Sequence, residues 1–232
     1  MFCKKETKRV IEGLWNYLDT GTNVDAGCQV KNPVSSYTCD EMARQEWESF
    51  FQDYSHALGL SSELPEAGSF LTNSDLGKPI LMTRDEQGRF RAFLNVCRHR
   101  GAILEEKERG RRRLFSCPFH GWGYSSAGGL ISVPKEDQFG DIDKSCNGLV
   151  ELPAEEKHGI LWVHPDPNGS FDLEAQLGEL AAEFDSWGFE KYIFQGNTTF
   201  EHQMNWKLAI DTFGETYHFN TLHRDTLAKD FH

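Results

Sequence analysis

The hydrophobic positions of the chain change their spacing along the sequence. Near the N-terminus they recur at helical spacing, so a short amphipathic helix is expected there. Its apolar positions are Val10, Ile11, Leu14, Trp15 and Leu18. Residues 21–33 are predicted to form a loop. Thr38 or Asp40 is expected to cap a second, aromatic-rich helix that runs to about Ala57.

From about residue 64 the apolar positions form short runs that are separated by turn residues, as in antiparallel sheets. Two hairpins are predicted, with their turns at residues 85–88 and 125–129. A further buried strand is predicted over residues 159–163. Because these strands are short and closely spaced, they predict a small antiparallel β-domain over residues 64–165.

The segment 165–169, which contains two prolines and a glycine, predicts a domain boundary. Apolar residues at helical spacing then predict a helix over residues 173–184. The β-branched and aromatic residues of Tyr192 to Glu201 predict a strand. The predicted parts of the chain are, in order, an N-terminal helical segment (1–63), the β-domain (64–165) and the start of a further domain (166–232).

The chemistry of the β-domain is concentrated in two short arms, each with one cysteine and one histidine. They are Cys97-Arg98-His99-Arg100-Gly101 and Cys117-Pro118-Phe119-His120-Gly121-Trp122. Two thiolates and two imidazoles in mixed pairs suit a [2Fe–2S] centre in which imidazoles replace the thiolates on one iron. Cys97 and Cys117 are expected on the inner iron, and His99 and His120 on the outer one. A zinc site is the nearest alternative, but finger-type zinc sites usually group Cys with Cys and His with His, whereas each arm here is mixed.

Other residues of the arms have expected supporting roles. The glycine that follows each arm is expected to let the chain turn tightly beside the cluster. Trp122 is expected either to shield the cluster from water or to serve as an ordinary core residue. The basic run Arg109-Gly110-Arg111-Arg112-Arg113 lies between the arms. It is interpreted as a solvated hairpin tip balanced by nearby glutamates, with docking of an acidic electron donor as the alternative.

A second candidate site lies in the segment that begins at Asn205, which is expected to cap a helix starting at Trp206. By helical rotation Asp211, Glu215 and His218 share a face opposite an apolar stripe. His223 lies about 140° from His218 on a regular helix, so the two histidines converge only if the helix ends or deforms near residues 220–221. The face is interpreted either as exposed surface or as part of a non-haem Fe(II) site with two histidines and one carboxylate.

The two arms resemble the Rieske motif of ring-hydroxylating oxygenase alpha subunits, and the segment from Asn205 to His223 resembles the mononuclear-iron segment of the same family. The resemblance implies that His218 and His223 bind the iron and that Asp211 fixes the orientation of a histidine ring. It also implies that Glu215 links the Rieske centre of one subunit to the iron of its neighbour. The family usually has Asp at this position, and Glu is similar to the carnitine-type quaternary-ammonium oxygenases.

The resemblance further implies an α+β protein, with a Rieske β-domain followed by the start of a helix-grip (Bet v1-like) catalytic domain. The implied function is the terminal oxygenase component of a multicomponent system, a dioxygenase or monooxygenase of aromatic or other small organic compounds. An NAD(P)H-dependent reductase or a ferredoxin is the implied electron donor, and a homotrimer or α3β3 assembly is the implied state. The family's carboxylate ligand is expected beyond His232, so the sequence is interpreted as a fragment; Asp225 and Asp230 are the nearer candidates.

Three alternatives to this function remain open at this stage. The chain could be a Rieske ferredoxin-like electron carrier without its own oxygenase site. It could be a quaternary-ammonium monooxygenase, as Glu215 suggests. A zinc-stabilised structural module is the third.

Composition excludes several further classes of function. The chain has 232 residues and a net charge of −12, which argues against nucleic acid and against an anionic membrane surface as partners. It has no run of 18 apolar residues and no apolar stretch typical of a secretory signal. The remaining cysteines show no pairing pattern, so a reduced, cytoplasmic protein is expected. They are Cys3, Cys28, Cys39 and Cys146.

Overall fold

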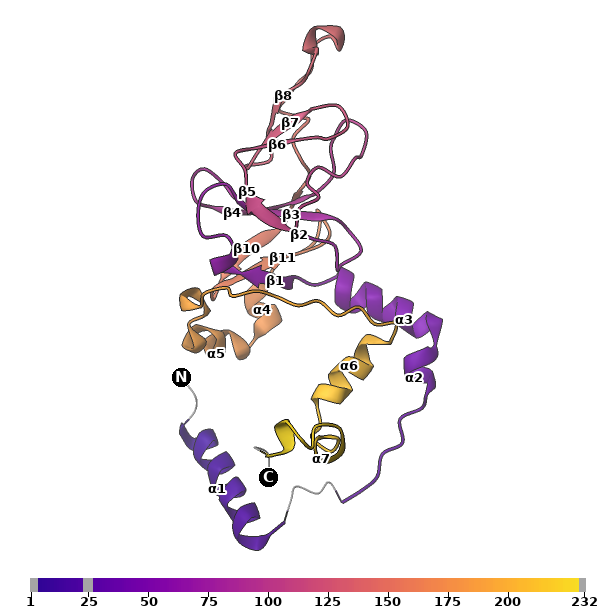
Figure 1. Cartoon of the computed structure of the whole chain (residues 1–232), viewed down its shortest axis with the longest axis vertical. Coiled ribbons are helices and arrows are strands. Elements are labelled where there is room, and N and C mark those ends of the chain that lie inside the picture. The colour runs from indigo at the N-terminus through magenta and orange to yellow at the C-terminus, as the bar shows by residue number, and fades with distance from the viewer. Residues whose placement is uncertain (1–3, 23–26, 230–232) are drawn as a thin grey trace. The chain divides into compact units, whose positions relative to one another are not determined.

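The computed structural model describes residues 4–22 and 27–229, and its contacts divide the chain into two compact units (Figure 1). The larger unit comprises Met1–Val24 and Trp47–Gln195. The smaller unit comprises Asp25–Glu46 and Gly196–His232. Cys3 and Asp230, which the sequence analysis named, lie outside the described residues.

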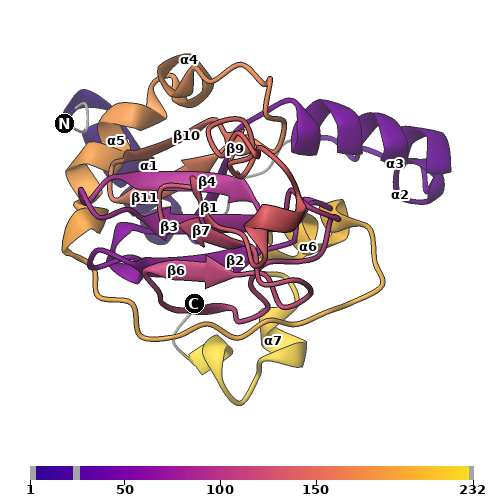
Figure 2. The ribbon, with the colours of Figure 1, turned by 90° about the horizontal axis from the view of Figure 1, so that it is seen from above.

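The larger unit is built on antiparallel sheets, as predicted. Its strands are β1 (His56–Leu60), β2 (Ser69–Asn73), β3 (Ile80–Arg84), β4 (Phe90–Leu94), β5 (Arg109–Arg111), β6 (Leu114–Ser116), β7 (Gly123–Ser125), β8 (Leu130–Ser132), β9 (Glu151–Leu152), β10 (Ala154–Lys157) and β11 (Ile160–Val163). They form three sheets with the orders β1-β11-β10, β5-β2-β3-β4-β9 and β6-β7-β8. Figure 2 shows β2, β3 and β4 side by side in the central sheet.

Both predicted hairpins and the predicted buried strand are present. β3 and β4 pair around the turn that ends at Gly88, whose φ is 76°, and β7 pairs with β8 around a turn that contains Gly128, whose φ is 82°. Glycine adopts these left-handed angles without the strain that a Cβ would cause. All four residues of β11 are buried. The alternation and turn signals of the sequence therefore located this part of the fold correctly.

The helix that was expected to run to Ala57 ends earlier. It consists of α3 (Asp40–Glu46) and the π-helical segment η1 (Trp47–Gln52), and the chain then enters β1 at His56. β1 pairs with β11, so its residues take part in a sheet edge and not in a helix. The aromatic run gave no sign of this change, because aromatic residues fit either a helix face or a strand.

Three hydrophobic clusters lie among the described residues of the larger unit, and two of them pack against the central sheet. One lies beneath the two cysteine–histidine arms and includes Phe70, Phe93, Phe115 and Tyr124. The other lies between the central sheet and the β1-β11-β10 sheet and includes Leu64 and Leu161, both fully buried. The arms therefore stand on a rigid, close-packed base, which suits residues that must hold a fixed geometry.

The predicted helix over residues 173–184 is two short helices, α4 (Leu173–Leu177) and α5 (Leu180–Trp187), separated by Gly178 with a φ of 53°. Leu173 packs with Ile160 and Trp162 of β11. The 3₁₀ helix η4 (Phe189–Lys191) follows, and the strand predicted over Tyr192–Glu201 is absent from the structure. Among the described residues this segment has no strand to pair with, so its β-forming composition has no effect.

The remaining helices are exposed. α1 (Lys4–Thr20) is the amphipathic N-terminal helix that was predicted, and it exposes all of its apolar side chains. In the smaller unit the helices are α2 (Ser35–Thr38), α3, α6 (Trp206–Phe213), α7 (Phe219–Leu222) and the turn η5 (Leu227–Lys229). None of the described residues of this unit is buried.

Candidate metal centres

The two cysteine–histidine arms of the larger unit adopt the same turn. In each arm the residue before the cysteine pairs antiparallel with the residue six positions after the cysteine. These pairs are Val96 with Ile103 and Ser116 with Gly123. In each arm the cysteine N–H donates to the carbonyl five residues later, at 2.8 Å, and the glycine four residues later donates back to the cysteine carbonyl. These glycines, Gly101 and Gly121, have φ angles of 73° and 74°. The expectation that each glycine permits a tight turn is thus confirmed.

A buried asparagine closes the base of the first arm. The side-chain amide of Asn95 donates to the carbonyl of Glu105 at 2.7 Å, and its carbonyl oxygen accepts from the N–H of the same residue at 3.0 Å. The side chain of Glu105 is itself buried and forms an ion pair with Arg112. These contacts join Asn95, which precedes the arm, to Glu105, which follows it. Losing them would leave buried polar groups without hydrogen bonds, so they hold the two ends of the arm together.

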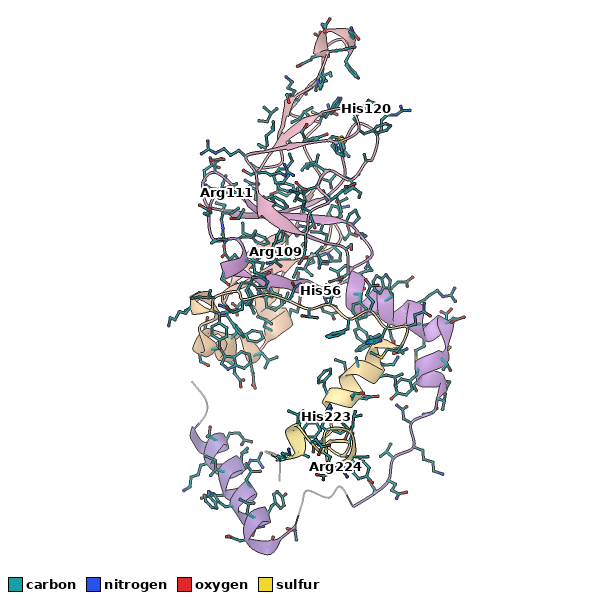
Figure 3. All side chains as sticks on the ribbon, in the orientation of Figure 1. His56, Arg109, Arg111, His120, His223 and Arg224 are labelled. Carbon is teal, nitrogen blue, oxygen red and sulfur yellow. The ribbon has the colours of Figure 1, made fainter. Side chains whose placement is uncertain are left out.

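The predicted cluster residues are brought together at one end of this unit. Cys97 and Cys117 are 2 % and 3 % exposed. The rings of His99 and His120 lie 4.7 Å apart, centroid to centroid, and His120 is exposed on its loop (Figure 3). Buried sulfurs beneath two adjacent imidazoles, one of them facing solvent, match the inner and outer positions expected from the sequence.

His99 provides the direct test of whether these residues fit a metal cluster. Its Nδ1 atom is buried and has no hydrogen-bond partner, which is rare for a polar atom in a folded protein. Burial, followed by the nearby His120 and Arg100, lowers the pKa of His99, so the neutral ring that a metal requires is favoured. An unsatisfied imidazole nitrogen beside two buried cysteines fits a cluster ligand.

The four arm residues are not gathered around one point. Within residues 4–22 and 27–229, no three His, Cys, Asp or Glu side chains form one close group. A [2Fe–2S] cluster has two irons and sulfide bridges, so its four protein ligands are spread more widely than those of a single ion.

Aromatic side chains cover the histidine end of the arms. Trp122 is buried and stacks on His99, with ring centroids 4.9 Å apart and an angle of 10° between the planes. Phe139, which follows the turn η3 (Glu136–Gln138), packs edge-on against both His99 and Trp122. Trp122 thus contacts a predicted ligand directly, while its shielding of the cluster stays a prediction.

Tyr124 connects the two arms. Its oxygen accepts the N–H of Arg98 at 3.0 Å and lies 3.3 Å from Cys97 Sγ, although the tyrosine follows the second arm in β7. The residue is fully buried, and burial, followed by the contact with Cys97, raises the pKa of the phenol. Since the phenol accepts from Arg98, its own proton is available for the sulfur of Cys97.

We expect Tyr124→Phe to lower the reduction potential of the cluster. A hydrogen bond to a cluster sulfur favours the reduced state, which carries one more negative charge. Loss of a hydrogen bond worth about 0.5–1.5 kcal/mol corresponds to a fall in reduction potential of about 20–60 mV for a one-electron couple. Protein-film voltammetry measures this shift. An unchanged potential, with the cluster content retained, would show that the phenol does not donate to the sulfur.

The basic run between the arms is largely paired within the larger unit. Arg109 contacts Glu63 and Glu108, and Arg111 contacts Glu66. Arg112 pairs with Glu105, as described above. The expected charge balance is therefore present. The run is not a hairpin tip, because Arg109–Arg111 form β5, which pairs with β2 at the edge of the central sheet. Docking of an acidic donor stays a hypothesis.

The helix of the smaller unit ends earlier than predicted. It was expected to continue past His218 and deform near residues 220–221. Instead α6 ends at Phe213, and the N–H of Gly214 caps it by donating to the carbonyls of Ile210 and Asp211. His218 and His223 flank the one-turn helix α7, as its N-cap and C-cap residues. Glu215 and His218 therefore do not share a helix face with Asp211, and the predicted stack of three side chains is absent.

The histidines nevertheless lie close together, with ring centroids 5.3 Å apart. Glu215 lies 2.5 Å from His218 Nδ1 and accepts the backbone N–H of the same residue at 3.2 Å. This contact with His218 lowers the pKa of Glu215, so the carboxylate is ionised at neutral pH. If Nδ1 carries the proton, Nε2 of His218 keeps a lone pair for a metal.

Asp211 lies in a different environment from the one expected. The hydroxyl of Tyr37 donates to its carboxylate at 2.6 Å, and Asn205 in turn donates to the carbonyl of Tyr37 at 3.1 Å. Among the described residues no hydrogen bond joins Asp211 to His218 or His223. Asn205 also caps α6 as predicted, by accepting the N–H of Lys207.

Comparisons with known proteins identify both parts of the chain. A family model described as a Rieske [2Fe-2S] domain matches residues 55–153, and one described as the catalytic domain of ring hydroxylating alpha subunits matches residues 189–232. The chain therefore combines a Rieske [2Fe–2S] domain with part of a catalytic domain of the ring-hydroxylating alpha-subunit type. A Rieske domain carries a [2Fe–2S] cluster, and this family of oxygenases uses a mononuclear iron in addition. The resemblance stated from the two arms and the Asn205–His223 segment is confirmed.

Individual relatives agree with this assignment. The alpha subunit of biphenyl 2,3-dioxygenase from Rhodococcus jostii (strain RHA1) is 31 % identical over 80 % of this chain and 41 % of its own length. A structure of the quaternary ammonium Rieske monooxygenase CntA is 27 % identical, with a TM-score of 0.75 over 83 % of this chain and 54 % of that one. Naphthalene 1,2-dioxygenase with bound indole is 31 % identical, with a TM-score of 0.70 over 82 % and 44 %.

The chain spans less than half the length of the curated relatives it matches, for example 41 % of the biphenyl enzyme and 43 % of a naphthalene 1,2-dioxygenase large component from Ralstonia sp.. In the part that the structure describes, no helix has the length and apolar character needed to cross a bilayer. The predicted α+β fold with an antiparallel Rieske domain is confirmed, while the domain bounds at residues 63 and 165 stay predictions.

Several residues of these sites were not singled out from the sequence. They are Asn95, Tyr124, Phe139 and Tyr37. Each acts through a contact with a residue distant in the chain or on a neighbouring loop, and single polar or aromatic residues give no spacing signal for such contacts. Only the position of Tyr124, two residues after Trp122, offered a hint.

Proposed function

We propose that this chain is part of the terminal oxygenase component of a multicomponent Rieske system, which hydroxylates an aromatic or other small organic substrate with O2. The observation that carries the proposal is the pairing of two buried cysteines with two adjacent imidazoles, one of which has an unsatisfied buried nitrogen. The family match of residues 189–232 to the catalytic domain supports the oxygenase over a simple electron carrier.

The cluster is held by Cys97, Cys117, His99 and His120 in this proposal. The cysteines supply thiolates from the buried side, and the imidazoles supply neutral ligands from the side that faces solvent. His99 binds through Nδ1, the atom without another partner. Trp122 and Tyr124 are positioning residues, since one stacks on His99 and the other contacts Cys97 Sγ.

The mononuclear iron is held by His218 and His223, with Glu215 orienting His218. The two rings supply part of the required donor set, and a carboxylate completes such sites in general. Asp225 stays a candidate for this carboxylate, together with a residue beyond His232. Asp211 accepts a hydrogen bond from the hydroxyl of Tyr37, and among the described residues no hydrogen bond joins it to His218 or His223.

When bound, the cluster supplies single electrons and the mononuclear iron supplies the activation of O2 for hydroxylation. The residues of this chain bind these groups, orient the imidazoles and hold the carboxylate of Glu215 on His218. We place an NAD(P)H-dependent reductase or a ferredoxin as the electron donor, and a homotrimer or α3β3 assembly in the cytoplasm as the working state. The described cysteines are all unpaired, which agrees with a reducing compartment.

A quaternary-ammonium monooxygenase is the second candidate. It is favoured by Glu215, which stands where the family usually has Asp, and by the similarity to the CntA structures. The glycine betaine monooxygenase oxygenase subunit of Chromohalobacter salexigens is also similar, at 29 % identity. Turnover of naphthalene and of carnitine by the reconstituted enzyme separates the two candidates.

We expect purified protein prepared without oxygen to contain about two irons and two acid-labile sulfides per chain, with a Rieske-type EPR signal after reduction by dithionite. A third iron would show that His218 and His223 bind metal in this chain and would support the oxygenase over a ferredoxin-like carrier. Zinc without sulfide would contradict the proposed function as a whole.

A further inference from the structure

The hairpin that joins β10 and β11 carries a histidine that the proposed function does not use. Lys157 pairs with Ile160, so His158 and Gly159 form a two-residue turn, and their φ angles are 55° and 73°. Turns of this kind require positive φ at both residues and favour Asn-Gly. The turn alone therefore does not account for a histidine at this position.

The turn is packed beneath the helices that follow the sheet. A Cβ on Gly159 would lie 2.2 Å from the backbone nitrogen of Glu190, so only glycine fits there. The side chain of His158 is 4 % exposed, and its Nδ1 lies 2.5 Å from the carboxylate of Asp185 on α5. The imidazole is thereby held in one orientation by a carboxylate on one nitrogen.

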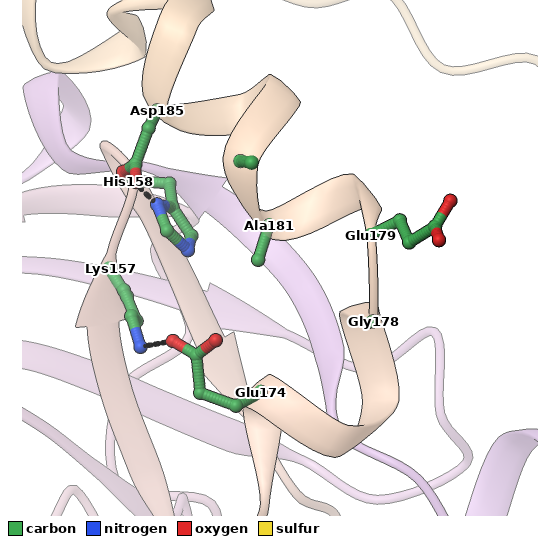
Figure 4. A pocket seen from close by; sticks show the side chains of 8 residues that line it. Lys157, His158, Glu174, Gly178, Glu179, Ala181 and Asp185 are labelled. Atoms are coloured by element: carbon green, nitrogen blue, oxygen red, sulfur yellow. Dashed lines mark hydrogen bonds and ion pairs between the residues drawn. The ribbon is translucent and has the colours of Figure 1, made fainter. Parts of the chain in front are cut away.

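The other nitrogen, Nε2, is buried and has no hydrogen-bond partner. His158 lines a cavity of about 420 Å³ between the hairpin and the helices α4 and α5. Figure 4 shows Nε2 turned away from Asp185 and toward the space beside Ala181. A proton on Nδ1, facing the carboxylate, leaves Nε2 as an acceptor directed into this cavity.

The other charged groups of the cavity wall make it acidic. Glu174 and Asp185 carry carboxylates on the side of His158, whereas Glu179 points away from it (Figure 4), and the single ammonium of Lys157 is already paired with Glu174. Figure 4 shows the second carboxylate oxygen of Glu174 on the side of His158. The cavity therefore offers two acceptors, one imidazole nitrogen and one carboxylate oxygen, in an environment that attracts positive charge.

A metal ion is a poor fit for this cavity, since the described part of the chain has no set of three close His, Cys, Asp or Glu donors. A cation with N–H groups fits better, because each N–H can donate to one of the two acceptors. We propose that this cavity binds a primary ammonium group, supplied either by a small free amine or by a lysine side chain of a partner protein.

The test uses protein with its cluster and with ¹⁵N-labelled histidine. Propylammonium is expected to shift the Nε2 resonance of His158 saturably, with a dissociation constant in the millimolar range. Tetramethylammonium carries the same charge without N–H donors and is expected to leave the resonance unchanged. Equal binding of both cations, a response to acetate in their place, or tighter binding of Zn²⁺ would overturn the proposal.

Two matched variants separate binding from folding. His158→Asn keeps a residue that this turn favours, so it retains the fold but is expected to weaken propylammonium binding at least about tenfold, followed at the backbone amides of residues 178–185. His202→Asn, at an exposed histidine of the smaller unit, is expected to bind normally. Unchanged binding in His158→Asn would show that His158 only fastens the hairpin to α5.

A third ligand distinguishes the two sources of the ammonium group. An Ala-Lys-Ala peptide amide that binds more tightly than propylammonium identifies a lysine side chain of a partner protein. Equal or weaker binding of the peptide identifies a free amine. None of these measurements depends on oxygenase activity, so failure of the proposed function would leave them unaffected.

Discussion

Cys117→Ser is expected to abolish the iron–sulfur cluster, whereas Cys146→Ser is expected to leave it intact. Cys117 is 3 % exposed at the base of the second arm, where we propose that its sulfur binds the cluster. A serine hydroxyl is a harder and much less acidic ligand, and soft iron–sulfur clusters select thiolates. Iron and sulfide should fall from about two each per chain to background, and the Rieske EPR signal should vanish.

Cys146 is a suitable control because it is an exposed cysteine of the same unit. Its thiol donates to Asp143 at 3.1 Å and lies on a loop outside the two arms. Loss of the cluster in both variants would indicate a general sensitivity to thiol removal. Retention of sulfide in Cys117→Ser would remove this residue from the ligand set and contradict the proposed arrangement.

Glu215→Gln is expected to reduce turnover by about 10–100-fold while both metals stay bound. Glu215 contacts Nδ1 of His218 and, by resemblance, also carries the link between the two centres. Glutamine has nearly the same shape, so it preserves packing but removes the charge that fixes the ring and its tautomer. The measurement is kcat in the oxygenase reconstituted with its electron donor, together with iron and sulfide content.

Glu201→Gln makes the same charge change at an exposed glutamate of the same unit, and we expect it to be neutral. Slow turnover of Glu215→Gln with one iron missing would point to a role in holding metal. Unchanged turnover with full metal content would exclude Glu215 from the electron path. A normal rate of cluster reduction is expected in the parent protein and in both variants, because the proposed role of Glu215 follows reduction of the cluster.

The sequence predicted the cluster arms well because their information is local. Each arm combines a cysteine, a histidine and a glycine within five residues, and glycine four positions after the cysteine is what the turn requires. The histidines follow their cysteines by two positions in one arm and by three in the other, yet both arms keep the same backbone hydrogen bonds. Turn chemistry therefore sufficed to predict the backbone of both arms, while the assignment of the four ligands stays a prediction.

Other features depended on contacts that no local pattern contains. The end of the helix at Gln52 follows from the pairing of β1 with β11, more than a hundred residues later. The helix α6 ends at Phe213 although the apolar stripe continues to Tyr217, which is 93 % exposed. Gly214 lowers helix propensity, and among the described residues nothing buries the stripe beyond it. Tertiary packing, absent from a periodicity argument, decides both boundaries.

The anchoring of Tyr124 has a consequence for how the cluster is loaded. Its strand begins directly after the second arm, while its hydroxyl is bound at Cys97 and Arg98 of the first. If one arm becomes disordered, the contacts of Tyr124 with Cys97 and Arg98 are lost and the other arm is destabilised as well. The two pairs of ligands are therefore gained or lost together. Cluster insertion should accordingly be all-or-none, with fully loaded and fully empty molecules side by side during assembly and no lasting population that carries one iron.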